Sequence, residues 1–221
     1  MRHGPGPIPA IFRLPGPGRY SARRTRNYCR GANRPPAAGK GAGEKWGVPM
    51  TETAPDAELS PERTLVLIKP DAVLRGLSGR ILSRFEDIGL KIVAVKTVRM
   101  DAELIRRHYA DLEERLGTEI YLRTAAFMSQ GPVISLVLEG FDVVATVRKL
   151  IGAACPNEAA PGTIRGDLSH FSSSASIATG KGMANLVHAS ANREEAAYEI
   201  GVWFAKEELL EYRTLAEQLM Y

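Results

Sequence analysis

Two short apolar runs constrain the fold of this chain more than any other feature: residues 64–68 (TLVLI) and 133–138 (VISLVL). Continuous runs of β-favouring residues, with little polar alternation, are typical of strands that are covered on both faces. We therefore expect a buried strand at each run and other elements packed against the sheet they form.

Two further segments also predict strands. Residues 91–100 place Ile92 and Ala94 on one face and Val93 and Val95 on the other, which is the alternation of a strand. Residues 182–190 (GMANLVHAS) form a mostly apolar run that ends in a histidine between an asparagine and a serine. We expect this run to be the fourth strand.

Between the strands, helices are indicated by apolar spacing and by end signals. Ile81, Phe85 and Ile88 form one apolar stripe, which Gly89 is expected to close as a left-handed cap. Asp101 predicts the start of a helix that runs to about residue 109, and a further helical segment reaches about residue 128.

The second half of the domain follows the same pattern. Asp142 is expected to cap a helix with Val143, Val147 and Leu150 on its inner face and Gly152 at its end. Residues 153–181 are rich in Pro, Gly and Ser and predict a long irregular stretch. Loops of this length inside a compact domain are uncommon and usually have a function. The pair Asn192 and Glu195 resembles a capping box at the start of a last helix, through Phe204. Strands that alternate with helices predict an α/β sandwich around one sheet.

The first 49 residues differ from the rest in charge. They hold ten of the 29 Lys and Arg residues and one of the 25 acidic residues, about +9, which leaves 19 basic and 24 acidic residues, about −5, beyond them. The net charge of +4 therefore does not argue for nucleic-acid binding by the folded part. We expect residues 1–60 to be a disordered extension and residues 61–221 to form the folded domain, because the Gly, Pro and Arg of the extension bury little surface.

Three interpretations of the extension stay open: a transit peptide, a phosphate-attracting arm, or translation from an upstream start with Met50 as the natural first residue. We favour the third. Cys29 and Cys155 form no disulfide framework, and no run reaches the ~18 apolar residues of a membrane span. A cytoplasmic protein with reduced cysteines and no membrane partner is the simplest expectation.

Several polar residues stand at the ends of apolar elements or inside the long stretch. A lysine after a buried strand, such as Lys69 before Pro70, either reaches solvent or meets an anion. Three cations with neutral donors are what a polyphosphate requires during transfer. The glycine-rich phosphate loops of the common nucleotide folds are missing. The residues of interest are Lys69, Tyr109, Arg148, Arg165, Asn185, His188 and Ser190.

Together these segments resemble the nucleoside diphosphate kinase family over residues 62–212. The resemblance rests on seven short motifs that stand in the family's order and nearly at its spacing. They are Glu62-Arg63-Thr64, Ile68-Lys69-Pro70-Asp71, Arg75-Gly76, His108-Tyr109, Ser129-Gln130-Gly131-Pro132, residues 161–167 and Asn185-x-x-His188-Ala189-Ser190. The resemblance implies a ferredoxin-like βαββαβ fold with a four-stranded antiparallel sheet and helices on its faces, in place of a parallel sheet.

The resemblance also implies roles for single residues. His188 corresponds to a nucleophile that takes the γ-phosphate of a nucleoside triphosphate, mainly ATP, and passes it to a nucleoside diphosphate by a ping-pong route. Glu199 corresponds to the group that orients this imidazole, Lys69 to the principal cation, and Tyr109 and Ser190 to groups near the transferred phosphate.

The implied nucleotide-binding residues are Lys69, Arg148 and Arg165 for the phosphates and Asn185 for the ribose. Tyr121 and Ile120 compete for the place of the aromatic side chain that stacks on the base. Mg²⁺ is the implied cofactor, held mainly by phosphates and water, and the implied assembly is a hexamer or tetramer built from dimers.

Three departures from the family pattern stand near these positions. Ala154 occupies the place of a threonine that contacts phosphate, and Ala191 replaces an aspartate. About ten extra residues lie between Arg165 and Asn185. They motivate an alternative function, a weakly active regulatory or nucleic-acid-binding protein, although nucleic acid is the less expected partner.

Overall fold

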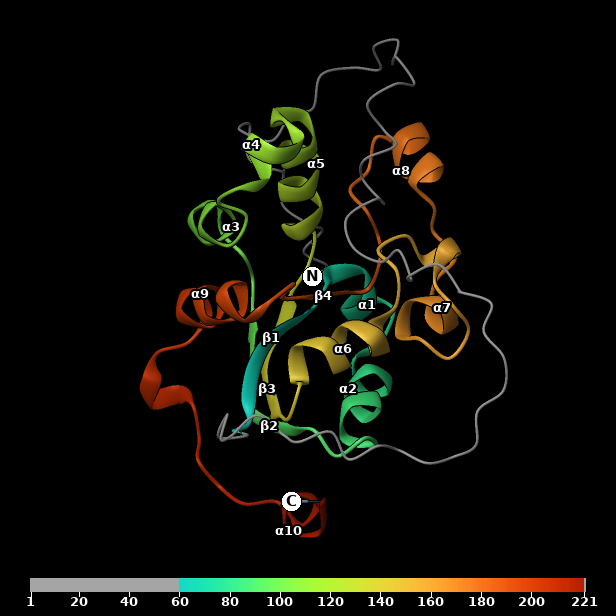
Figure 1. The fold of residues 1–221 in the computed structure, drawn as a ribbon. Coiled ribbons are helices and arrows are strands. Elements are labelled where there is room, and N and C mark those ends of the chain that lie inside the picture. Colours follow the sequence, from blue (N-terminus) through green and yellow to red (C-terminus); the bar gives the residue numbers. More distant parts are fainter. Residues whose placement is uncertain (1–59, 221) are drawn as a thin grey trace, which may run out of the picture.

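The computed structural model describes residues 60–220, and its four strands form one antiparallel sheet in the order β2-β3-β1-β4 (Figure 1). The strands are β1 (Glu62–Ile68), β2 (Lys91–Val98), β3 (Val133–Gly140) and β4 (Val187–Ala189). This sheet confirms the ferredoxin-like expectation and excludes the parallel arrangement. The expected extension falls outside the described residues, apart from residue 60.

The first strand lies between the third and the fourth. Leu65 pairs with Val137 of β3, and Leu67 pairs with His188 of β4. Residues from Leu65 to Ile68 are fully buried, and alternate residues enter two separate apolar cores. The prediction of a strand covered on both faces is therefore confirmed.

Helices cover both faces of the sheet (Figure 1). One core takes residues from α1 (Pro70–Leu74), α2 (Ser78–Glu86), α6 (Val143–Ile151) and α7 (Ile164–Leu168). The other takes residues from α3 (Ala102–His108) and α5 (Thr118–Met128). Helix α9 (Arg193–Trp203) contributes Ala196 to the first core and Trp203 to the second.

The expected end of α2 is partly wrong. Ile81 and Phe85 are buried, but the helix ends at Glu86 and Ile88 is 40% exposed. Gly89 has a φ of +80°, as expected for a left-handed turn, and the next residue donates its N–H to Phe85. Leu90 enters the core in place of Ile88 because this turn redirects the chain.

The cap predictions have mixed outcomes. Asp101 accepts a hydrogen bond from the N–H of Leu104 at 2.8 Å, as expected. Asp142 makes no side-chain cap bond because its backbone is left-handed, with a φ of +48°. Asn192 accepts from Glu195 N, but the Glu195 carboxylate accepts from Ala191 N, so only half of the capping box forms.

Residues 153–181 are more regular than expected. They contain a 3₁₀ turn, η3 (Pro156–Glu158), helix α7 and helix α8 (Ser173–Thr179). The structure also has α4 (Leu112–Leu116), η4 (Lys206–Glu208) and α10 (Leu215–Met220). Cys155 is buried. No helix in the described part of the chain is long and apolar enough to cross a membrane.

Candidate active site around the fourth strand

Lys69 stands where β1 ends and α1 begins, and it does not reach solvent. Its ammonium donates to Met183 O at 2.7 Å and to Asn185 Oδ1 at 2.8 Å, and it lies 4.7 Å from the centroid of the Phe127 ring. Burial lowers the pKa of Lys69 to about 8; the charge of Asp71 opposes this shift, and that of Arg165 adds to it. The ammonium is therefore mostly charged at neutral pH.

A strained turn precedes the histidine of β4. Val187 N donates to Asn185 O at 2.8 Å, and Leu186 between them has a φ of +70°, which closes a γ-turn with a left-handed central residue. Leu186 O accepts from Lys69 N at 2.8 Å, and Leu186 N donates to Asp71 Oδ2 at 3.0 Å. Both backbone polar groups of the strained residue are thus bound by the start of α1.

Arg165 holds the same turn from the other side. Its Nε donates to Asn185 O at 3.1 Å, Nη1 to Gly152 O at 2.8 Å and Nη2 to Val187 O at 2.6 Å. Burial lowers the pKa of Arg165 to about 10; the charge of Arg148 adds to this shift and that of Asp71 opposes it. The guanidinium therefore stays charged at neutral pH while it binds three backbone carbonyls.

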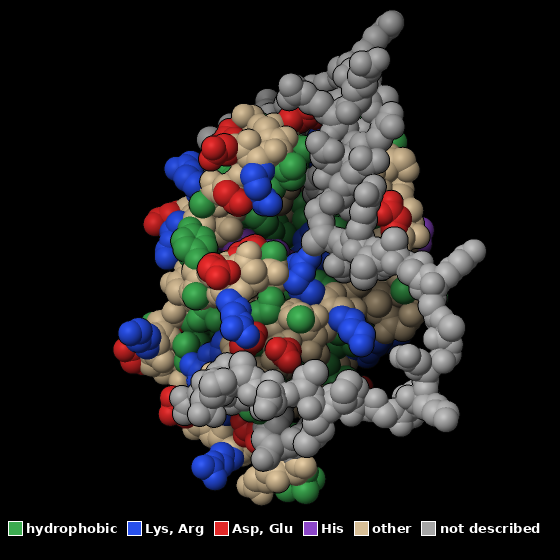
Figure 2. Space-filling model, in the orientation of Figure 1, with side chains coloured by type: hydrophobic (Ala, Val, Ile, Leu, Met, Phe, Trp, Pro, Cys, Tyr) green, Lys and Arg blue, Asp and Glu red, His purple; other side chains and the backbone are tan. Residues whose placement is uncertain are grey.

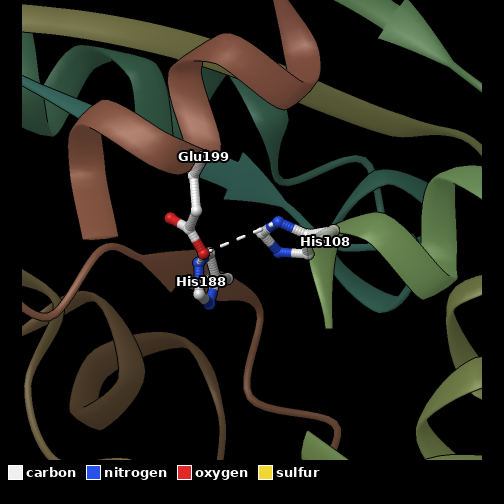
Figure 3. A group of neighbouring side chains, drawn as sticks. All are labelled: His108, His188 and Glu199. Carbon is white, nitrogen blue, oxygen red and sulfur yellow. Dashed lines mark hydrogen bonds and ion pairs between the residues drawn. The ribbon is translucent and has the colours of Figure 1, made fainter. Parts of the chain in front are cut away.

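His188 lies in β4, directly after this turn. Its Nε2 is 2.7 Å from Glu199 Oε1 (Figure 3). Ser190 Oγ donates to Glu199 Oε2 at 2.6 Å. When Nε2 carries the proton and donates to the carboxylate, Nδ1 keeps its lone pair. The side chain of His188 is 22% exposed, so this nitrogen belongs to a ring that solvent can reach.

Glu199 is buried in α9 but remains acidic. Burial would raise the pKa of this carboxyl, but the charge of His188 and the hydrogen bonds from His188 and Ser190 bring it below its ordinary value. Each carboxylate oxygen thus has a donor, and the carboxylate is ionised at neutral pH.

Aromatic rings surround the histidine on the side of α3. The His108 ring makes edge-to-face contacts with His188 at 4.7 Å, Tyr109 at 4.6 Å and Trp203 at 5.7 Å between centroids. Burial lowers the pKa of His108 to about 3; the charge of His188 adds to the shift and that of Glu199 opposes it. His108 is therefore a neutral, buried imidazole beside His188.

His108, His188 and Glu199 are close enough to suggest a metal centre, since one ligand atom from each lies within 4.8 Å of the others. They are the one group of this kind in residues 60–220. Trp203 Nε1 donates to His108 Nδ1 at 3.3 Å, however, and both oxygens of Glu199 have hydrogen bonds. Mg²⁺ prefers oxygen ligands, so this cluster does not fit a magnesium cage.

Most of the remaining predicted residues lie around the same turn. Arg148 Nη1 approaches Ala189 O at 3.4 Å, and Ala154 O accepts from Asn185 Nδ2 at 2.8 Å. The Tyr109 ring is 6.4 Å from that of His188. Tyr121 packs against the second core, and no hydrogen bond or ring contact in the described residues joins it to the others.

Sequence reasoning missed three residues of this site. Asp71 stands beside Lys69 in one motif, and His108 stands beside Tyr109 in another, so proximity to a chosen residue was their available signal. Trp203 gave no signal, because an apolar residue near the end of an amphipathic helix is expected in a core.

Comparisons with known proteins agree with this geometry. The nucleoside diphosphate kinase family model matches residues 62–209. The chain is 46% identical to human nucleoside diphosphate kinase 3 over 160 residues, 72% of this chain and 87% of that protein. It is 45% identical to the nucleoside diphosphate kinase of Pyrococcus furiosus over 156 residues, 71% of this chain and 91% of the relative.

Solved structures give the same result. One is a transition state mimic of the Borrelia burgdorferi nucleoside-diphosphate kinase with bound vanadate and ADP; its TM-score is 0.69 at 42% identity, over 71% of this chain and 95% of that one. Another is the Halobacterium salinarum nucleoside diphosphate kinase in complex with CDP, with a TM-score of 0.64 at 38% identity over 72% and 98% of the two chains. The chain therefore belongs to the nucleoside diphosphate kinase family, and its activity is that of a nucleoside diphosphate kinase.

Proposed function

We propose that this kinase works by a ping-pong route through a phosphohistidine on His188. The lone pair of Nδ1 attacks the γ-phosphorus of a nucleoside triphosphate, the N–P bond forms, and the bond to the bridging oxygen breaks to release the diphosphate. A terminal phosphate oxygen of a second nucleoside diphosphate then attacks the phosphorus, and the N–P bond electrons return to Nδ1. The supporting observation is the bond from Nε2 to Glu199, which leaves Nδ1 as the nucleophile.

Glu199 and Ser190 are proposed to act on the imidazole. The ring gains positive charge as the N–P bond forms, and a carboxylate 2.7 Å from Nε2 stabilises that charge. Ser190 Oγ is fully buried and donates to the other carboxylate oxygen, which fixes the orientation of Glu199.

The cations around the turn are proposed to bind the phosphates. The Lys69 ammonium, with a pKa of about 8, carries its charge at neutral pH and loses it as pH rises above 8. Arg165 uses three of its five N–H groups on backbone carbonyls and keeps two for a ligand. Arg148 lies beside β4, and Tyr109 lies beside His188. Fixed positive charge at this place stabilises the equatorial phosphoryl oxygens during transfer.

Mg²⁺ is proposed to enter as part of the Mg–nucleotide substrate. The described residues offer no group of three carboxylates, which is consistent with a metal held by phosphates and water. The ion would screen the phosphate charge, while the protein's own cations position the γ-phosphate opposite His188.

The rest of the nucleotide has fewer contacts to assign. Asn185 Nδ2 keeps one N–H beyond its bond to Ala154 O, and we propose that it contacts the ribose. Tyr121 or Ile120 would stack on the base. Broad base specificity follows, with ATP as the main donor and other nucleoside diphosphates as acceptors, so that the enzyme balances nucleotide pools.

We further propose that residues 61–221 form the complete catalytic domain, that the enzyme assembles from dimers into a hexamer or tetramer, and that it acts in the cytoplasm. A nucleic-acid-binding role has less support. On the face drawn in Figure 2, Lys and Arg side chains of the described residues are mixed with Asp and Glu instead of forming one basic surface.

The phosphoenzyme provides the direct test. Incubation with ATP labelled at the γ-phosphate should give an acid-labile, alkali-stable phosphoprotein that His188→Gln lacks and that a diphosphate acceptor discharges. His170→Gln is the matched control, because the same change is made in a loop histidine that makes no hydrogen bond or ring contact with His188. Absence of label on the wild-type protein, or full label on His188→Gln, would overturn the proposal.

A further inference from the structure

Two histidines approach one oxygen of Glu199. His188 Nε2 lies 2.7 Å from Oε1, and His108 Nδ1 lies 3.5 Å from the same atom (Figure 3). The side chains of His108 and Glu199 are almost completely buried. Something must decide which imidazole donates its proton to the carboxylate.

Trp203 sets the tautomer of the neutral His108 ring, that is, which of its two nitrogens carries the proton. The indole N–H is a donor only, and it lies 3.3 Å from His108 Nδ1, so that nitrogen must accept. A neutral imidazole has one N–H, which is therefore on Nε2 of His108. This Nε2 is buried and has no hydrogen-bond partner in the described residues. The tautomer is therefore set by the indole at Nδ1 and not by an acceptor at Nε2.

We propose that Trp203 and His108 form a tautomer lock that reserves Oε1 of Glu199 for His188. Because His108 Nδ1 has no hydrogen, it cannot donate to the carboxylate, and the carboxylate stays with the nucleophile. Both residues are thus positioning residues. The inference rests on the proposed function, because the reserved oxygen matters for catalysis only when His188 is the nucleophile.

The surroundings of His108 keep the lock closed. The titratable groups in contact with its ring in the described part of the chain are His188 from β4, Glu199 from α9 and Tyr109 at the end of α3. Burial and the adjacent His188 oppose protonation of His108, whose pKa is about 3, so a second proton does not arrive at neutral pH. The lock therefore holds at neutral pH.

The kinetic test uses a variant and its suppressor. Trp203→Phe keeps an aromatic ring but removes the N–H, so His108 can place a proton on Nδ1 and compete for Glu199. We expect kcat to fall about tenfold with little change in KM. His108→Phe keeps a ring of similar shape and removes the competitor, so the double variant should recover most of this loss.

A purely structural role predicts the opposite result. His108 and Trp203 are in contact, so their packing defects need not add, but a purely structural role gives His108→Phe no proton competition to remove. A double variant that is no faster than Trp203→Phe alone would overturn the proposal. The acid limb of the pH profile gives a second readout. It should move to higher pH in Trp203→Phe, because His108 loses a donor that favours its neutral form, and it should return in the double variant.

Nitrogen NMR of the wild-type protein tests the lock without using activity. The expected spectrum has an unprotonated Nδ1 and a protonated Nε2 on His108 from pH 5 to pH 9, assigned with the His108→Phe variant. A protonated Nδ1 would overturn the lock even if ATP labels the enzyme. Absence of label with the expected tautomer would instead overturn the phosphohistidine proposal, so the two failures are distinguishable.

Discussion

The chain between Arg165 and His188 contains two regions that are held in different ways. Residues 183–187 receive side-chain hydrogen bonds from Lys69 and Arg165 and give one to Asp71, over sequence separations of 20 to 116 residues. Helix α8 has no buried residue, and its side-chain hydrogen bonds are local: Ala175 N donates to Ser172 Oγ, and Ser176 Oγ donates to Lys181 O. Charged side chains from distant elements fix the first region, and its own serines fix the second.

Gly182 marks the boundary between the two regions. A Cβ there would lie 2.7 Å from Phe127 Cβ and 3.0 Å from Arg123 O, so the chain passes closely under α5 at this point. Helix α8 lies before this passage, in the stretch between Arg165 and Asn185 where the resemblance predicts about ten extra residues. The difference predicts that changes in the first region alter both stability and catalysis, whereas changes in α8 alter neither.

The largest expected effect is from Arg165→Met. Three buried carbonyls lose their donor, so the free energy of unfolding should fall by about 3–5 kcal/mol, and kcat should fall with it. Urea unfolding measures the first quantity. Ser176→Ala is the control in the second region, since it also removes a donor to a backbone carbonyl, and it should change stability by less than ~0.5 kcal/mol. Equal effects of the two substitutions would break the comparison.

Lys69 gives a pH-dependent effect of intermediate size. Its pKa is about 8 in the folded protein against the ordinary 10.5, so the unfolded chain binds more protons between these values. The free-energy cost of burying the charged ammonium is fully present below pH 8. As pH rises from 8 to 10.5 the folded protein loses this charge first, so the free energy of unfolding should increase by about 3 kcal/mol.

The measurement is the difference in unfolding free energy between the wild-type protein and Lys69→Met at pH 7, 9 and 10. Other groups titrate in both proteins and cancel. Nucleotide affinity should fall over the same interval as the ammonium loses its charge. Equal pH slopes in the two proteins would show that Lys69 is not a buried charge of this kind.

The smallest effect is expected in α8. Ser172→Ala removes the N-cap acceptor of this helix, which should weaken its amide protection by about 1 kcal/mol. Hydrogen exchange measures this local change. The free energy of global unfolding should change by less than ~0.5 kcal/mol, and kcat should stay within about twofold of the wild-type value. A larger loss of kcat would mean that α8 belongs to the catalytic apparatus.

The strands could be predicted because their apolar runs need no long-range information. Strand β4 is the instructive exception: residues 182–190 were expected to be extended, but only Val187–Ala189 pair. The γ-turn at Leu186 shortens the strand, and it depends on bonds to Lys69 and Asp71 that no local pattern contains.

The same reasoning limits what sequence says about the site. The roles of His188, Glu199 and Lys69 were predicted by family resemblance and not by local spacing, because the contacts that these residues make join positions 11 to 116 residues apart. Asp142 shows the opposite failure. A good capping residue stands directly before the helix, but its backbone is left-handed and its carboxyl makes no cap hydrogen bond. Residue roles in catalysis remain predictions until the variants are measured.

The order of strands in the sheet also has a consequence for synthesis. Strand β1 is made first but lies between β3 and β4, and Glu199 follows Lys69 by 130 residues. A growing chain must therefore carry an unpaired central strand until residues 133–140 leave the ribosome, and it cannot form the nucleotide site until α9 has emerged. Nucleotide binding thus reports that translation of the domain is nearly finished.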